Sequence, residues 1–280
     1  MNLFDSVCQT FAAIATGGFS TRNAGVGFWH SDYIISVLTV VMFLAGLNFI
    51  SLYNIRRQGI KSILKNSVFR YFTGIVACAY ALLLLSTLIR GAETSWDSLF
   101  LYPVFHIVSA VTSTGFSLDG VESWGPFSLF LTIFLMICGA CAGSTSGGIK
   151  VDRLIVMKDN FLNEIKKTVF PKRTYVVQLN GSALNNGLVT RISAFITLYI
   201  LIIIIATAII TLFGYSMTDS LFMVSSCIGC NGLGYGATGA GGSFAFLPYS
   251  VKWLLMAVML IGRLELFTFL VLLLPSFWKR

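Results

Sequence analysis

The segment VSAVTSTGFS, residues 108–117, decides the fold, because two other segments of the chain follow the same pattern. These are FAAIATGGFS at residues 11–20 and SSCIGCNGLG at residues 225–234. When the three are aligned on Gly18, Gly115 and Gly232, small residues compatible with a helix precede each glycine and a bulky residue follows it. Self-similarity of this kind indicates a repeated structural unit.

The composition around these segments is that of a membrane protein. Hydrophobic residues make up 56% of the 280 residues and charged residues only 11%, whereas soluble domains carry about 25% charged residues. A hydrocarbon core of roughly 30 Å requires about 20 consecutive apolar residues. Five stretches meet this length, at approximately residues 33–53, 71–89, 126–149, 191–213 and 249–275. The sequence therefore predicts a polytopic, all-α integral membrane protein.

Each interval between successive aligned glycines contains two of these spans, so the three copies enter the membrane in the same orientation. Each copy reads as a span, a helix of about ten to fourteen residues that is too short to cross, a glycine turn and a span. Aspartate–serine pairs precede the short helices and are predicted to cap them. The pairs are Asp5-Ser6, Asp97-Ser98 and Asp219-Ser220.

A re-entrant helix followed by a loop is tolerated at membrane depth only where protein or a water-filled cavity satisfies its backbone. Three such loops around one axis would present backbone carbonyls to a dehydrated cation, and the short helices would point their partly negative C-terminal ends at it. The pattern favours a pathway for a monovalent cation. Ordinary extracellular turns remain the alternative.

The run GACAGSTSGGIKV, residues 139–151, predicts a break in the span that begins near Pro126. Six of the ten residues from Gly139 to Gly148 are glycine or alanine, and each glycine weakens a helix by about 1 kcal/mol relative to alanine. The polar residues between them would form hydrogen bonds with the backbone groups that the break leaves unpaired. Close packing of two helices through Gly139 and Gly143 is the alternative.

Arg263 lies near the middle of the apolar run at residues 258–274. A charge at this depth is costly and indicates a functional site. We expect Arg263 to project into the permeation path, just on the inner side of the loop that contains Gly232. There its charge would act as a barrier beside the Gly-rich loop. Glu265 would face neighbouring helices and pair with an unidentified basic group. A structural salt bridge between helices is the alternative for Arg263.

Two CxxC patterns, Cys138–Cys141 and Cys227–Cys230, are typical of zinc or redox sites in soluble proteins. Both lie in apolar segments without clustered histidines, so we interpret them as small residues in packed helices and expect no transition metal. No hydrolytic triad is present, which argues against an enzyme. No basic and aromatic interleaving of the kind that binds nucleic acid is present either.

Four motifs, in this order, resemble the Trk/Ktr/HKT superfamily of potassium transporters, and within it the TrkH-type potassium uptake subunit. They are TGGFSTRNAG at residues 16–25, VTSTGFS at residues 111–117, GACAGSTSGGIK at residues 139–150 and IGRLEL at residues 261–266. The resemblance covers essentially the whole chain. It implies a fold of tandem membrane–pore–membrane repeats around a pseudo-fourfold pore, here with five spans and three re-entrant pore loops.

The chain resembles the second repeat from its pore helix onward, the third and the fourth, with the first absent. The predicted division is residues 1–55 for the second repeat, 56–150 for the third, 151–190 for a basic cytoplasmic segment and 191–280 for the fourth. The predicted potassium-binding filter is Thr16, Gly17, Gly18, Phe19, Ser113, Thr114, Gly115, Phe116, Cys230, Asn231, Gly232 and Leu233. The predicted gate is Gly139, Gly143, Ser144, Thr145, Gly147, Gly148 and Arg263.

Fifteen of the nineteen Lys and Arg residues fall on one side of the five-span arrangement, and cytoplasmic loops are the positive ones. We therefore expect the C-terminus to lie in the cytoplasm, and the resemblance implies a bacterial inner-membrane protein. The predicted function is potassium uptake without a covalent cofactor, K⁺ being the transported ion. The resemblance further implies a homodimer and a TrkA-type nucleotide-binding regulatory subunit that docks on residues 150–190.

Two other functions stay open: a symporter that couples potassium to sodium or protons, and a non-conducting subunit that only assembles with partners. The chain begins just before a pore helix and holds three of four filter segments. We therefore expect it to be a piece of a longer transporter.

Overall fold

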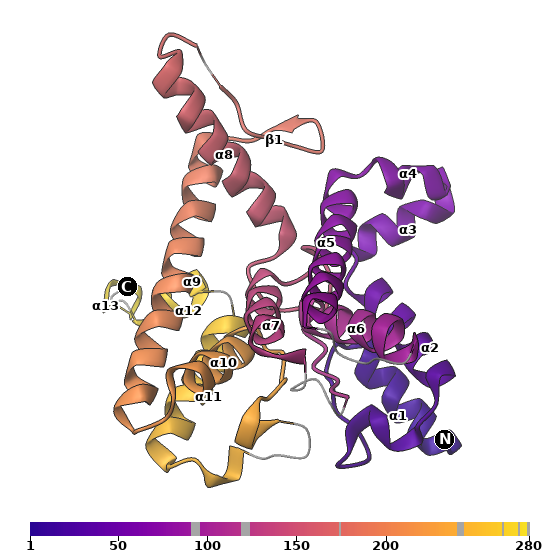
Figure 1. Ribbon diagram of the computed structural model, residues 1–280. Helices are drawn as coiled ribbons and strands as arrows, with labels where there is room; N and C mark the ends of the chain where they lie inside the picture. The colour runs from indigo at the N-terminus through magenta and orange to yellow at the C-terminus, as the bar shows by residue number, and fades with distance from the viewer. Residues whose placement is uncertain are drawn as a thin grey trace.

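The chain folds mostly into helices (Figure 1). The computed structural model describes residues 1–90, 96–118, 124–173, 175–239, 244–264, 266–273 and 275–278. Glu265 lies outside them, so its predicted pairing is not addressed. The apolar helices form an all-α membrane protein, as the sequence predicts, while the predicted division into four stretches of chain stays a prediction.

Among the described helices that are too short to cross a membrane, three lie just before the aligned glycines. They are α1 (Leu3–Ile14), α6 (Trp96–Val111) and α10 (Met217–Ile228). With 12 residues each, α1 and α10 reach only about 18 Å at about 1.5 Å per residue. The prediction of three short helices is confirmed.

Only two of the predicted spans are single straight helices, α5 (Ser67–Ile89) and α9 (Asn186–Leu212). Helices α2 (Asp32–Ala45) and α3 (Phe49–Gln58) form a pair bent by 92°. Helices α11 (Tyr249–Arg263) and α12 (Leu266–Leu273) form a pair bent by 115°. Helix α7 (Pro126–Cys138) ends before the Gly-rich run. The stretches at 33–53 and 249–275 are therefore bent helix pairs and not single helices, and the stretch at 126–149 is interrupted at the Gly-rich run, as predicted.

The bend between α2 and α3 lies between Gly46 and Asn48. Gly46 packs so tightly that a Cβ added to it would lie 2.7 Å from Cγ2 of Thr112. Asn48 then starts the new helix, because its side-chain oxygen accepts hydrogen bonds from the backbone N–H groups of Ile50 at 2.9 Å and Ser51 at 3.2 Å. An asparagine cap of this kind satisfies donors that a helix start leaves unpaired.

The predicted caps of α1 and α10 are wrong. Ser216 is the N-cap of α10 and accepts a hydrogen bond from the backbone N–H of Asp219 at 3.1 Å, so Asp219 lies inside the first turn. Asp5 also lies in the first turn of α1 and accepts a hydrogen bond from the hydroxyl of Thr21 at 2.7 Å. A carboxylate in the first turn interacts favourably with the helix dipole without capping it. The side chains of Asp97 and Ser98 lie outside the described ones.

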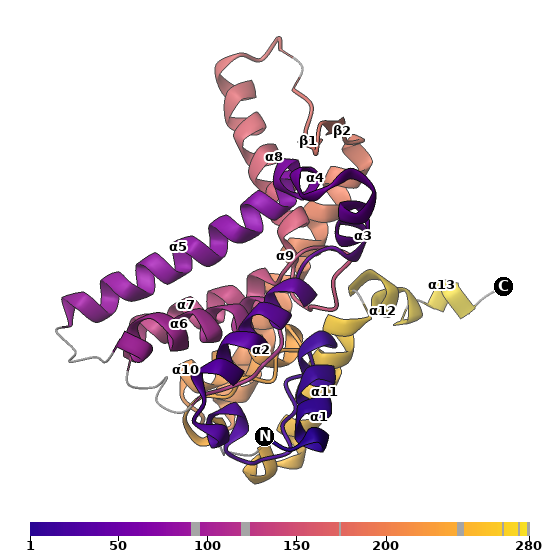
Figure 2. The same ribbon diagram turned by 90° about the vertical axis from the view of Figure 1, so that its right-hand side faces the viewer.

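The basic segment forms an arm on one side of the molecule. Helix α8 (Val151–Val169) runs beside the first half of α9, and a hairpin of β1 (Gln178–Leu179) and β2 (Ser182–Ala183) lies next to both (Figure 1). Figure 2 shows α12 and α13 (Pro275–Trp278) leaving the bundle toward the C-terminus. The other elements are α4 (Ile60–Lys65) and the 3₁₀ turns η1 (Gly25–Trp29), η3 (Gly236–Thr238) and η4 (Phe244–Phe246).

Two large hydrophobic clusters hold the helices together. One joins α5, α6 and α7 around Phe72, whose side chain is 0% exposed and whose ring lies 5.2 Å from that of Phe43. The other joins α9, α10 and α11 around Tyr199 and Val224. Helix α7 lies between the two groups (Figure 1) and contacts both α6 and α10. The short helices α6 and α10 are thus held by packing on both sides.

Phe72→Ala should destabilise the protein strongly. Inside a membrane protein the loss is mainly of van der Waals contacts, and truncating a buried phenylalanine in a packed core costs about 3 to 5 kcal/mol. Leu85→Ala, on the same helix at 54% exposure, is the matched control and should change stability little. Thermal unfolding in detergent, followed by size-exclusion chromatography, measures both. Equal losses would mean that this cluster does not hold the bundle.

Candidate permeation site

The three aligned loops share one backbone conformation. In each, the residue two before the aligned glycine and the glycine itself have a positive φ, a conformation uncommon for residues other than glycine. The values are 50° at Thr16 and 68° at Gly18, 55° at Ser113 and 83° at Gly115, and 49° at Cys230 and 84° at Gly232. The repeat found in the sequence is therefore a repeat of backbone geometry.

The same hydrogen bond closes each short helix. The backbone N–H of Gly17 donates to the carbonyl of Ala12 at 2.8 Å, that of Thr114 to Ser109 at 3.0 Å and that of Asn231 to Ser226 at 2.9 Å. This bond between residues five apart, next to a left-handed residue, is the Schellman ending of a helix. Sequence reasoning missed it, because the left-handed position holds threonine, serine or cysteine instead of glycine.

Successive loops touch through their backbones. A Cβ added to Gly18 would overlap the carbonyl oxygen of Thr114, and a Cβ added to Gly115 would overlap that of Asn231. No atom of the described residues lies within 4 Å of a Cβ built on Gly232. The three loops thus lie in sequence order along an arc, and the Gly232 end of that arc is open.

The bulky residue after Gly115 and the one after Gly232 each pack toward the preceding short helix. Phe116, 1% exposed, joins a cluster with Ala13 of α1, and Leu233, 3% exposed, joins a cluster with Ala110 of α6. Phe19 is 81% exposed. The arc is therefore open at its Phe19 end as well.

The loop after α6 is fixed by side chains. The amide nitrogen of Asn231 donates to the carbonyl of Ala110 at 2.6 Å, and the hydroxyl of Ser109 donates to the carbonyl of Phe116 at 2.8 Å. The side chains of Thr114 and Asn231 are buried. These contacts tie the loop after α6 to the loop after α10.

The Gly-rich run interrupts the helix as predicted, since α7 ends at Cys138 and α8 begins at Val151. The chain turns back on itself. The backbone N–H of Ile149 donates to Ile137 at 3.0 Å, and that of Lys150 donates to Cys138 at 2.9 Å. Because Gly139 through Gly143 are not helical, helix packing through these two glycines does not occur.

Two side chains hold the base of this loop at a single residue, Ala142. The Nδ2 group of Asn48 donates to the carbonyl of Ala142 at 2.6 Å, and the Oδ2 atom of Asp152 accepts a hydrogen bond from the N–H of Ala142 at 2.5 Å. The sequence analysis missed both residues. A signal for Asn48 was present, because it is an amide near the end of an otherwise apolar predicted span.

The tip of the loop crosses from one side of the arc to the other. The hydroxyl of Thr145 donates to the carbonyl of Ile14 at the end of α1 at 3.2 Å. The Nη1 group of Arg263, the last residue of α11, donates to the carbonyl of Thr145 at 3.2 Å. A Cβ added to Gly147 would overlap the carbonyl oxygen of Gly229, just before the third loop. Predicted filter, Gly-rich loop and arginine therefore lie together.

Comparison with known proteins gives the family. A family model described as TrkH, cation transport protein, matches residues 1–280. The chain belongs to the TrkH family.

Relatives of this TrkH-family chain are named as potassium uptake proteins. It is 31% identical over 283 residues to the Trk system potassium uptake protein TrkH of Escherichia coli (strain K12), and 33% identical to the TrkH protein of Vibrio parahaemolyticus. Both matches cover 100% of this chain and 58% of the relative, so the chain spans less than two thirds of their length. These names are those of transport proteins and not of enzymes.

The crystal structure of the potassium transporter TrkH from Vibrio parahaemolyticus has the same fold as this TrkH-family chain. The TM-score is 0.92 at 31% identity, over 99% of this chain and 60% of the other. The predicted fold of membrane–pore–membrane repeats is confirmed. The roles of the filter and gate residues stay predictions.

Gly115→Ala should destabilise the protein more than Gly232→Ala. Both positions have nearly the same positive φ, which costs about 1 to 2 kcal/mol for a residue with a Cβ. Only at Gly115 must the new methyl group also displace a neighbouring backbone carbonyl, which adds about 1 to 3 kcal/mol. Thermal unfolding of the two variants side by side measures the difference. Equal destabilisation would contradict the contact between successive loops.

Proposed function

We propose that the protein takes up potassium ions across the bacterial inner membrane through a filter of backbone carbonyls. The filter segments are residues 16–19, 113–116 and 230–233. The observation that carries this proposal is the backbone conformation repeated at three loops in mutual contact. Carbonyl rings of this kind replace the hydration shell of a monovalent cation. Potassium is chosen because the relatives are named as potassium uptake proteins.

A fourth segment of the same kind closes the proposed ring. It lies between the open side of Gly232 and the exposed ring of Phe19, which are the two free ends of the arc. The helices next to these ends support the proposal. Phe4 and Phe11 of α1 and Trp253 of α11 are exposed large apolar side chains, which is the expected state of a helix face that covers a neighbouring repeat.

The Gly-rich loop is the proposed gate and Arg263 its charged element. The tip of the loop lies between the ends of α1 and α11, and its carbonyl at Thr145 accepts a hydrogen bond from Arg263. A guanidinium at this place repels a cation that leaves the filter. Among the described residues Arg263 forms no ion pair with a carboxylate, which favours this role over a structural salt bridge.

The basic arm is the proposed cytoplasmic side and docking surface. Helix α8 carries exposed apolar side chains at Phe161, Ile165 and Val169 among its basic residues. A face of this composition suits a protein partner, and we assign it to a TrkA-type regulatory subunit acting on a homodimer of the transporter. The Lys and Arg residues of this arm set the orientation of the spans, with the C-terminus in the cytoplasm.

Gly232→Ser tests the filter. The serine meets no crowding within the described residues, but it adds a side chain where the fourth filter segment is proposed. In bacteria without their own potassium uptake systems, this variant should lose most of the uptake that the wild-type chain supports. Gly181→Ser is the matched control, since Gly181 has a φ of 79° and equally open surroundings among the described residues, but lies in the β hairpin.

Both variants must reach the membrane in equal amounts. Equal potassium uptake by Gly232→Ser and Gly181→Ser would contradict the assignment of residues 230–233 to the filter. Absence of uptake by a wild-type chain that is present in the membrane would contradict uptake by this chain without the proposed fourth segment.

Arg263→Gln and Arg263→Ala separate the charge of Arg263 from its hydrogen bond. The glutamine keeps a donor for the carbonyl of Thr145 and removes the charge. If the charge is the barrier, both variants should raise potassium flux by roughly tenfold or more, since a unit charge about 8 Å away costs about 2 kcal/mol at an effective dielectric of about 20. Rubidium uptake into proteoliposomes measures this. If only Arg263→Ala raises the flux, the hydrogen bond and not the charge closes the gate.

A further inference from the structure

Helix α1 is mainly apolar, but the face that it buries carries two polar side chains. The buried residues of this helix are Asp5, Gln9 and Ala13, spaced four apart along one side. Asp5 is 6% exposed and Gln9 is 1% exposed. Buried polar side chains in folded proteins nearly always have hydrogen-bond partners, so this face of α1 is expected to lie against polar groups of the chain.

The polar groups that meet this face directly follow the first proposed filter segment. The Nε2 group of Gln9 donates a hydrogen bond to the Oγ atom of Ser20 at 2.8 Å. The hydroxyl of Thr21 donates to the Oδ1 atom of Asp5 at 2.7 Å, and the backbone N–H of Arg22 donates to the same Ser20 oxygen at 3.2 Å. We call the side chains of Asp5, Gln9, Ser20 and Thr21 the clamp, because they hold the chain that leaves the filter segment against α1.

The clamp belongs to the first loop. In the alignment of the three loops, Gln9 corresponds to His106 and Met223. His106 has its hydrogen bond with Thr132 of α7 instead, over 2.9 Å, and a methionine side chain has no N–H or O–H group to donate. The first loop lies at the end of the arc where Phe19 is exposed, so among the described residues it touches another proposed filter segment on one side only. Its own helix supplies the support that a second neighbour would give.

Gln9 is an unfavourable residue for packing alone. Its Oε1 atom is buried and has no hydrogen-bond partner among the described residues, and a buried oxygen left unpaired destabilises a protein. A leucine, which is similar in size, would avoid this cost. The hydrogen bond from Gln9 to Ser20 therefore contributes more to the position of the chain after the filter segment than to stability.

We propose that Gln9 and Asp5 are positioning residues that set the preference of the first filter segment for potassium over sodium. In the proposed filter, carbonyls of residues 16–19 coordinate the ion, and a ring held at the width that suits potassium coordinates the smaller sodium ion less well. Ser20 directly follows Phe19, the last residue of this segment, so a bond at Ser20 limits the inward movement of these carbonyls. The proposal rests on the proposed potassium pathway and adds residues that determine its ion preference.

The ratio of potassium uptake to sodium uptake into proteoliposomes tests this role, because a change in the amount of folded protein scales both rates equally. Gln9→Leu removes one bond of the clamp at similar side-chain size. It should lower the ratio about fivefold, the factor that corresponds to one hydrogen bond of about 1 kcal/mol. Asp5→Leu removes the other bond and should lower the ratio to a similar extent.

Asp5→Asn is the conservative variant that should keep the ratio. Its side-chain oxygen still accepts a hydrogen bond from Thr21, whereas the charge opposite Arg22 is lost. The atoms of this ion pair are 3.9 Å apart and the side chain of Arg22 is 47% exposed, and pairs of this kind contribute little. A ratio that falls as far in Asp5→Asn as in Asp5→Leu would contradict the role of the Thr21 bond.

Thermal unfolding of the variants tests the bond between Gln9 and Ser20 whether or not the chain transports ions. Ser20→Ala leaves both polar atoms of the buried Gln9 side chain without a partner among the described residues, so it should be less stable than the wild type. Adding Gln9→Leu removes these atoms, and the double variant should regain most of the lost stability. It should nevertheless keep the lowered ion ratio, whereas a purely structural role would restore the ratio together with the stability.

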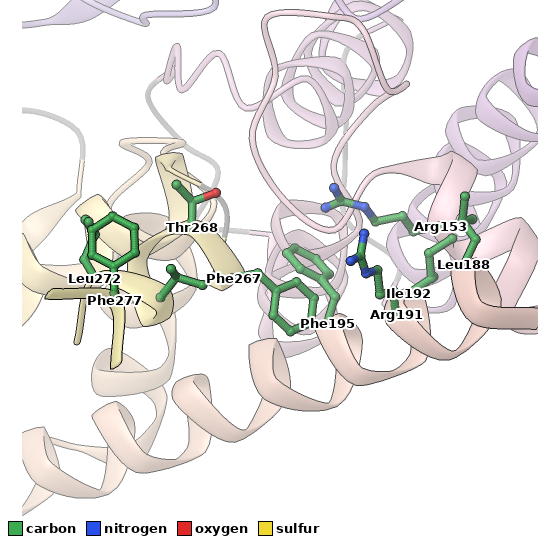
Figure 3. Close-up of a pocket in the computed structure, with 10 residues that line it drawn as sticks. Arg153, Leu188, Arg191, Ile192, Phe195, Phe267, Thr268, Leu272 and Phe277 are labelled. Atoms are coloured by element: carbon green, nitrogen blue, oxygen red, sulfur yellow. The ribbon is translucent and has the colours of Figure 1, made fainter. Parts of the chain in front are cut away.

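Two variants serve as controls. Thr10→Val changes a side chain of the same helix whose hydroxyl donates to the carbonyl of Ser6 within α1, and it should leave the ion ratio unchanged. Arg191→Gln removes one exposed charge from another part of the molecule, the wall of the cavity between α8, α9 and α12 (Figure 3). It should also leave the ratio unchanged, which shows that the loss of a surface charge alone has no effect on it.

The possible failures are distinguishable. Potassium uptake with a wild-type ion ratio in Gln9→Leu and Ser20→Ala would overturn the role of the clamp and leave the proposed function standing. A double variant no more stable than Ser20→Ala would contradict the hydrogen bond itself. A wild-type chain that carries neither ion would contradict the ion preference together with the proposed function, even if the unfolding measurements show the bond.

Discussion

The structure depends on one constraint: wherever a helix stops at membrane depth, its last backbone groups need partners, because lipid offers none. The short helices α1, α6 and α10 meet this constraint with the same turn, in which a left-handed residue brings the next N–H back to a carbonyl five residues earlier. The turn gives a hydrogen bond to one carbonyl that the helix end would otherwise leave unpaired. It also directs the following residues away from the helix. Gly18 and Gly115 then allow successive loops to touch through their backbones. The proposed filter is thus a by-product of ending three helices in the same way.

The Gly-rich loop meets the same constraint by a different route. It interrupts a helix, so the backbone N–H and C=O groups on both sides of the break need hydrogen-bond partners. Backbone hydrogen bonds join residues 137–140 before the loop to residues 149–151 after it. The side chains of Asn48 and Asp152 form hydrogen bonds with the carbonyl and the N–H of Ala142. The bonds at the base are 2.5 and 2.6 Å long, whereas those at the tip, from Thr145 and Arg263, are 3.2 Å. The firmly held base and the loosely held tip are the arrangement that a hinged gate requires.

The sequence predicts those features that arise from local chemistry repeated along the chain. The three loops were found because glycine must stand where φ is positive and backbones touch, and the break after Cys138 because glycine and alanine cluster there. Features that depend on distant partners were not found. Asn48 meets Ala142 across 94 positions of the chain, and the different exposure of Phe19 and Phe116 depends on the neighbour of each loop, not on the residue. The bend at Gly46 follows from contact with Thr112, which no local pattern encodes.

The position of Arg263 combines these effects. As the last residue of α11, it lies at the negative end of a helix dipole, which stabilises a cation there, and its bond to Thr145 adds a carbonyl dipole. Gly262, the residue before it, allows α11 to approach the end of α10 so closely that a Cβ would overlap the carbonyl of Ile228. The guanidinium is therefore held near the end of a pore helix by two backbone features that need no acidic partner. In the proposed pathway, a movement of the loop tip would remove the Thr145 carbonyl from Arg263, so opening the loop and releasing the arginine would be one event.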